Sequence, residues 1–175
     1  MKTTGVIRRI DELGRIVIPK EIRKNLRIKD GENIEIFIEG ENIILKKHSI
    51  LDKIKEDSKK IVEVINYFLK KNVIITDRDS VVAVSGNIKR EYKDKQISNY
   101  LSECIEDRKQ VLEEDIKSVC FVDNNEEQSS YCIVPVISDG DINGLVIITS
   151  EEKVDKSDLQ ICQIVAKILS KSLED

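Results

Sequence analysis

Residues 5–26 read GVIRRIDELGRIVIPKEIRKNL, a segment that alternates apolar and cationic residues, turns once and ends in a short helical pattern. The two-residue alternation over 6–10 and the β-branched run 15–18 predict two strands. Between them an aspartate and a glycine supply turn chemistry over 11–14, because one accepts backbone hydrogen bonds and the other tolerates positive φ. Pro19 suits the first turn of a helix, so we expect a short helix after it.

Positive charge is concentrated in this part of the chain. Residues 2–29 contain nine lysines and arginines and three acidic residues, a net charge of +6. The whole chain has a net charge of −4, so the remainder carries −10. Salt screens surface charges beyond about 8 Å at physiological ionic strength, so a partner that approaches this segment meets its local positive charge.

The next residues predict a hairpin. A turn over 29–32 precedes a strand over 34–39 with one aliphatic face, and a second turn leads into a strand over 43–47. A unit of four short strands and one short helix buries too little apolar surface to be stable alone. We therefore expect dimerisation, with strands of one copy completing the sheet of the other.

From residue 51 the pattern becomes helical. Apolar and small residues recur at spacings of three and four and form a seam: Leu51, Ile54, Ser58, Ile61, Ile65 and Phe68. Two interpretations stay open, because three heptads do not separate them. The helix packs on the core of its own domain, or it also pairs with the same helix of a second copy.

The remaining sequence predicts an α+β domain with one central antiparallel sheet. Five strands are expected, over 73–76, 81–85, 119–122, 131–137 and 145–149. Two further helices are expected over 97–105 and 161–173, while 86–95 and the acidic stretch 123–128 are expected to be loops. The predicted domain boundaries are 1–50 for the dimerising β unit, 51–72 for a connecting helix, and 73–175 for the α+β domain.

The sequence offers little catalytic chemistry, and we expect no enzyme, no cofactor and no metal. The single histidine, His48, lies between the two halves and is interpreted as a linker residue. Asp77 and Asp79 suggest a turn rather than a metal site. The four cysteines are widely spaced among apolar residues, as reduced buried thiols are. No apolar run reaches 18 residues and no signal peptide begins the chain, so we expect a cytoplasmic protein.

Two stretches resemble known families. TGVIRRIDELGRIVIPKEIRKNL followed by DGENIEIFIEGENIILKK closely resembles the swapped-hairpin DNA-binding domain of the AbrB-type transition-state regulators. Two later stretches, ITDRDSVVAVSG and DGDINGLVII, resemble parts of the GAF domain that follows the DNA-binding domain in one member of that group. The resemblance implies a transcription regulator of sporulation that forms an N-terminal all-β barrel as a dimer.

The same resemblance implies which residues contact DNA. They are six cations: Arg8, Arg15, Arg23 and Lys24, with Arg9 and Lys2 as supplementary candidates. Lys24 stands where the better-known pattern has arginine, and lysine cannot fork onto two acceptors, so we expect a phosphate contact there. The interpretation requires that these cations share one face and are not held in internal ion pairs.

We therefore expect dimers, and a dimer of dimers, that bind double-stranded DNA through phosphates and DNA shape. The GAF-like domain implies an unidentified small-molecule effector. Two alternatives remain: an antitoxin-like DNA-binding partner protein, and a metabolite-binding oligomer that does not bind DNA.

Overall fold

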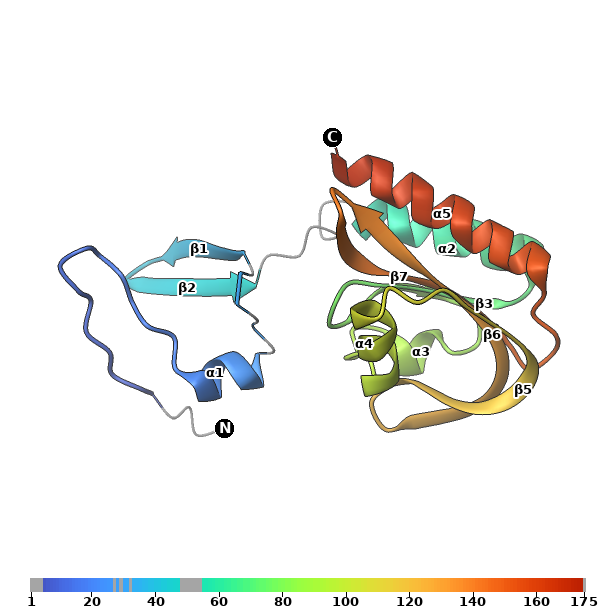
Figure 1. Cartoon of the computed structure of the whole chain (residues 1–175), viewed down its shortest axis with the longest axis horizontal. Helices are drawn as coiled ribbons and strands as arrows, with labels where there is room; N and C mark the ends of the chain where they lie inside the picture. Colours follow the sequence, from blue (N-terminus) through green and yellow to red (C-terminus); the bar gives the residue numbers. More distant parts are fainter. Residues whose placement is uncertain (1–4, 27, 29, 32, 48–54, 175) are drawn as a thin grey trace. The chain divides into compact units, whose positions relative to one another are not determined.

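The computed structural model describes residues 5–26, 28, 30–31, 33–47 and 55–174. Contacts along the chain divide it into two compact units, residues 1–48 and 49–175. Figure 1 shows the helices and strands of each unit.

The first unit contains one short helix and one hairpin. Helix α1 (Lys20–Asn25) follows Pro19, and strands β1 (Ile34–Glu39) and β2 (Asn42–Lys47) pair antiparallel. These elements confirm the predicted helix and the predicted hairpin. Among the described residues of this unit, Pro19 is the one that is buried, so the single chain forms no apolar core there.

The strands predicted over 6–10 and 15–18 are absent, and this prediction is wrong for the single chain. Among the described residues, the backbone hydrogen bond at the base of the turn runs from Asp11 N to Arg15 O at 3.1 Å, and it does not reach residues 6–10. An alternating sequence forms a strand only when a neighbouring strand pairs with its backbone. Their apolar side chains also lie exposed, Ile7 with 94% of its surface accessible and Val17 with 74%.

The second unit is an α+β domain with a five-stranded antiparallel sheet in the order β4-β3-β7-β6-β5, as predicted. Its elements follow in the order α2 (Lys55–Leu69), β3 (Asn72–Thr76), β4 (Val81–Ser85), α3 (Lys89–Tyr92), α4 (Asn99–Glu106), β5 (Val111–Val122), β6 (Asn125–Ser138), β7 (Asp141–Ser150) and α5 (Lys156–Glu174).

Helices cover both faces of this sheet (Figure 1). On one face, side chains of α2 and α5 pack with strand residues in an apolar cluster that includes Val62, Val146 and Leu169. On the other face, α3 and α4 pack in a second cluster that includes Tyr92 and Phe121. The strands between two such layers are apolar on both sides, which explains continuous runs such as Leu145 to Ile148.

Two predicted loops contain regular structure. The segment 86–95 contains α3, whose four residues are too few to show a helical period. The acidic stretch 123–128 is strand from Asn125 onward, because Asn124 adopts φ +61° and the chain reverses in a tight turn. Asparagine tolerates this left-handed conformation better than most residues. Its neighbours Glu126 and Glu127 therefore lie on β6.

The helical seam predicted from residue 51 is partly wrong. Ser58 is buried, and Ile61 and Ile65 pack against the core, but Phe68 is 75% exposed and Val62 is buried in its place. Leu51 and Ile54 fall outside the described residues. The helix therefore packs on its own domain through one face and presents Phe68 on another.

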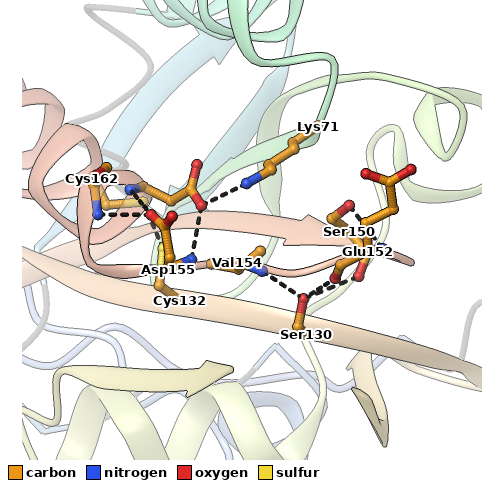
Figure 2. A network of polar contacts seen from close by, with 10 residues as sticks. Lys71, Ser130, Cys132, Ser150, Glu152, Val154, Asp155 and Cys162 are labelled. Carbon is orange, nitrogen blue, oxygen red and sulfur yellow. Dashed lines mark hydrogen bonds and ion pairs between the residues drawn. The ribbon is translucent and has the colours of Figure 1, made fainter. Parts of the chain in front are cut away.

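Figure 2 shows the polar contacts around the start of α5. Asp155 accepts a hydrogen bond from Ser157 N at 2.8 Å and so caps the helix, and the backbone bonds that it accepts lower the pKa of Asp155. Asp158 accepts from Lys71 Nζ at 2.6 Å and from Asp155 N at 2.8 Å. These contacts join α5 to the segment between α2 and β3.

The cysteines are free thiols in the second unit, as the sequence suggests. Cys104, Cys132 and Cys162 are buried, whereas Cys120 is half-buried. Cys132 Sγ and Cys162 Sγ lie 3.4 Å apart between β6 and α5 (Figure 2), and burial raises the pKa of Cys162. Protonated thiols in an apolar core act as small hydrophobic groups.

Candidate nucleic-acid interface

The candidate DNA-contacting cations lie on two segments of the first unit. Arg8 and Arg9 precede the turn over 11–14 and are exposed, as is Arg15 directly after it. Arg23 is half-buried and Lys24 exposed, both on α1. Lys2 falls outside the described residues.

Asp11 builds the turn between residues 6–10 and residues 15–18. Its Oδ1 accepts from Leu13 N at 3.0 Å and from Arg15 N at 2.8 Å, and Gly14 adopts φ +76°. Its Oδ2 accepts from Arg15 Nε at 2.7 Å. The hydrogen bonds from the Arg15 backbone and side chain lower the pKa of Asp11. The aspartate thus fixes the start of the Arg15 side chain.

Two of the candidate arginines take part in internal ion pairs. Arg15 pairs with Asp11, and Arg23 Nη1 contacts Asp30 Oδ1 at 2.8 Å. Both pairs are open to water, with the Arg15 side chain 71% exposed and that of Asp30 96%. Exposed pairs of this kind contribute about 0–1 kcal/mol. A phosphate oxygen can therefore replace either carboxylate at small cost, and the expectation of unpaired guanidinium groups is wrong for these two.

The remaining candidates have no carboxylate partner among the described residues. These are Arg8, Arg9 and Lys24. With α1 only six residues long, the described residues of this unit offer no helix that could fill the major groove as a recognition helix does. The arrangement suits contacts to phosphates and to DNA shape rather than extended reading of base edges.

The second unit contains a cavity of about 570 Å³, hereafter the acidic cavity. Its lining comes from the start of β3, the end of β7, the segment between β4 and α3, α3 itself, and β5 and β6. The lining includes four carboxylates and two apolar side chains: Glu91, Glu126, Glu127, Glu151, Ile88 and Ile116. Serine, asparagine and glutamine side chains complete it, and no lysine or arginine of the described residues is among them.

Glu127 is held in place by three hydroxyl donors. Tyr92 donates to Oε2 at 2.5 Å, while Ser129 and Thr149 donate to Oε1 at 2.9 and 3.0 Å. Burial raises the pKa of Tyr92, and the bond to Glu127 raises it further. The tyrosine therefore stays a neutral donor, and Glu127 has a fixed orientation.

The described residues offer no cluster of His, Cys, Asp and Glu side chains placed to hold a metal ion. Asp77 instead accepts from Asp79 N at 2.8 Å and from Ser80 N at 2.6 Å, which confirms the turn. His48 lies outside the described residues. In the part of the chain that the structure describes, no helix is long and apolar enough to cross a membrane.

Comparison with known proteins decides the family. The domain described as "Stage V sporulation protein T C-terminal, transcription factor" matches residues 53–174. Stage V sporulation protein T of Bacillus subtilis (strain 168) is 43% identical over 155 residues, which are 87% of this chain and 87% of that protein. The chain belongs to the stage V sporulation protein T family. Its members are transcription factors by the description of that domain.

The first unit has relatives of its own. The transition state regulatory protein AbrB of Bacillus subtilis (strain 168) is 52% identical over 48 residues, 27% of this chain and 50% of that protein. The domain described as "Antidote-toxin recognition MazE, bacterial antitoxin" matches residues 7–51. The AbrB-like assignment of the N-terminal domain is thereby confirmed.

Solved structures confirm the GAF-like fold of the second unit. The GAF domain of Acinetobacter phosphoenolpyruvate-protein phosphotransferase has a TM-score of 0.55 at 12% identity, over 71% of this chain and 90% of that one. The free methionine-R-sulfoxide reductase of Thermoplasma acidophilum has a TM-score of 0.55 at 16% identity, over 71% and 94%. One fold thus serves different activities, so function must be argued from the residues.

Sequence reasoning named no residue of the acidic cavity. Three of its glutamates lie in stretches interpreted as loops, and the fourth follows the last strand. The sequence does indicate a longer strand, because Glu127, Ser129 and Tyr131 continue the two-residue spacing of the strand predicted over 131–137 towards the N-terminus. Extending that strand backwards would have placed Glu127 on the sheet.

Proposed function

We propose that the chain is a dimeric, DNA-binding regulator of sporulation genes that acts in the cytoplasm, is not an enzyme, and responds to a small molecule. Membership of a transcription-factor family and the AbrB-like first unit support this most directly. Contact with DNA is assigned to the six cations already named: Arg8, Arg15, Arg23, Lys24, Arg9 and Lys2.

The need for a dimer follows from the exposed apolar surface of the first unit. Many apolar side chains among the described residues of the unit are exposed, including Ile7, Val17, Ile36 and Ile38. Burying apolar surface releases about 25 cal/mol per Å², so a second copy that covers these side chains stabilises the fold. Pairing of residues 6–10 and 15–18 with the partner would complete the swapped-hairpin barrel.

A second set of exposed apolar side chains favours a dimer of dimers. Val64, Tyr67 and Phe68 lie exposed on α2, and Ile164 and Ile168 lie exposed on α5. Helices α2 and α5 cover the same face of the sheet (Figure 1). Large exposed apolar side chains on neighbouring elements are typical of an interface, and the same surface of another copy is its natural complement.

The test removes two cations from each chain and measures DNA affinity in fluorescence-anisotropy titrations. Arg8→Ala with Arg15→Ala removes four positive charges from each dimer, and we expect affinity for duplex DNA to fall more than about 100-fold at physiological salt. Lys59→Ala with Lys60→Ala on α2 is the control, since it removes equal charge from the second unit. Unchanged affinity in a correctly assembled Arg8/Arg15 variant would show that these cations do not contact DNA, whereas no DNA affinity in the unsubstituted chain would support the metabolite-binding oligomer.

The match of residues 7–51 to an antitoxin domain favours one other candidate, an antitoxin-like partner protein. Such a protein would hold its toxin with a tail that folds on binding. The second unit here is a folded domain with two apolar clusters, which argues against that role. Neutralisation of a toxin by the full chain that is lost when residues 51–175 are removed would restore the antitoxin interpretation.

A further inference from the structure

We infer that the acidic cavity binds an aliphatic organic cation of the di- or polyamine class. The inference rests on the proposed sensory role of the second unit, but cation binding can be measured without DNA. Four glutamates line the hollow, and the described lining residues include no basic side chain to offset them. A concave surface lined by one sign of charge concentrates ligands of the opposite sign.

The size of the cavity favours an extended organic cation over a metal ion. At about 570 Å³ it is far larger than one ion needs and within the range of organic ligands. Its glutamates form no group that could hold a metal ion among the described residues. A polyamine, by contrast, separates its ammonium groups by methylene chains, and Ile88 and Ile116 offer apolar surface to those chains.

One of the carboxylates is already oriented for such a ligand. Glu127 accepts from Tyr92, Ser129 and Thr149, so its position is fixed before a ligand arrives. A pre-oriented acceptor loses little conformational freedom on binding. Glu91, Glu126 and Glu151 are exposed. Glu91 accepts from Asn125 Nδ2 at 3.5 Å and Glu126 accepts from Ser118 Oγ, and each uses one carboxylate oxygen for that bond, so the other oxygen remains for an ammonium group.

The cavity wall also contacts the helix that follows the first unit in sequence. Ile88 and Glu91 line the cavity at α3, and the adjacent Lys89 pairs with Glu63 of α2 at 3.3 Å. At the other wall, Asn72 Oδ1 accepts from Asn87 N at 3.0 Å. A Cβ on Gly86 (φ +116°) would lie 2.1 Å from that oxygen, so glycine is required for the contact. A ligand that moves α3 would reach α2 through the exposed ion pair between Lys89 and Glu63, which couples the two helices weakly.

The test is isothermal titration calorimetry of the full chain with spermidine at about 150 mM salt, without DNA. We expect one spermidine per chain, and affinity about tenfold weaker in Glu91→Gln with Glu151→Gln. Glu103→Gln with Asp141→Asn is the matched control, because it removes equal charge from exposed positions outside the cavity. This control should bind spermidine within about twofold of the unsubstituted chain.

Three results would overturn the inference: no spermidine binding, equal weakening in both double variants, or equally tight binding of the neutral comparison ligand leucine. Equal weakening would mean attraction to the overall negative charge rather than a site. Failure of the proposed function gives a different result: the protein binds spermidine but has no affinity for DNA.

Discussion

At the scale of single residues, the Asp11 carboxylate connects the turn to the candidate DNA contacts. It accepts from two backbone amides and from the Arg15 side chain, and these bonds favour its charged form. A carboxyl group whose pKa is lower in the folded state stabilises that state above its unfolded pKa, and the contribution disappears as pH falls through the folded pKa. The turn should therefore be intact at neutral pH.

We predict that the Asp11 carboxyl titrates below its ordinary pKa of 3.8. NMR spectra recorded from pH 7 to pH 2 should show the amide signals of Leu13 and Arg15 moving together with the Asp11 carboxyl signal, because both amides donate to it. The exposed Glu12 carboxyl serves as the internal comparison. A midpoint for Asp11 at or above 3.8 would contradict the geometry of the turn.

The ion pair between Lys71 and Asp158 belongs to a different class, because it is mostly shielded from water. The Lys71 side chain is 19% exposed and that of Asp158 is 4%. Removing one member of such a pair leaves a charge without its partner in a poorly solvated site.

Accordingly, Lys71→Met should lower the free energy of unfolding by about 2–4 kcal/mol, measured by urea denaturation. Lys60→Met is the control, because its pair with Asp57 is exposed, and it should change stability by less than about 0.5 kcal/mol. Equal effects in the two variants would show that Lys71 does not stabilise the start of α5.

At the scale of elements, the helices and strands that depend on the local residue pattern were predicted correctly from the sequence. The strands 73–76 and 81–85 and the helix face of Leu101, Cys104 and Ile105 all appear as expected. Predictions from periodicity were wrong where a neighbouring strand, or the backbone conformation of one residue, determines whether a strand forms. Residues 6–10 alternate correctly but lack a neighbouring strand, and the start of β6 depends on the positive φ of Asn124.

Helices α2 and α5 each carry apolar side chains beyond those that the core uses. We predict that Phe68→Glu with Ile168→Glu reduces a tetramer to a dimer in analytical ultracentrifugation, because charge at both exposed positions opposes burial against another copy. Circular dichroism should stay unchanged, since neither side chain packs in the core. Gln160→Glu with Ser172→Glu adds the same charge at polar exposed positions of α5 and should leave the tetramer intact. A tetramer that survives the first pair would exclude this surface as the interface.

At the scale of the whole molecule, charge is divided between a cationic first unit and an acidic remainder. The first unit has no core of its own among its described residues, so DNA binding and dimerisation are expected to depend on each other. Four cations from each of two chains would neutralise roughly 6–8 phosphates. Such binding is dominated by the release of counterions and therefore depends steeply on salt.

The most direct test of DNA binding by the first unit is the affinity for duplex DNA as a function of salt concentration. We predict that the logarithm of the association constant falls with the logarithm of salt concentration with a slope of about −5 to −7. A slope shallower than about −2 would contradict the claim that the paired cationic units bind the phosphate backbone.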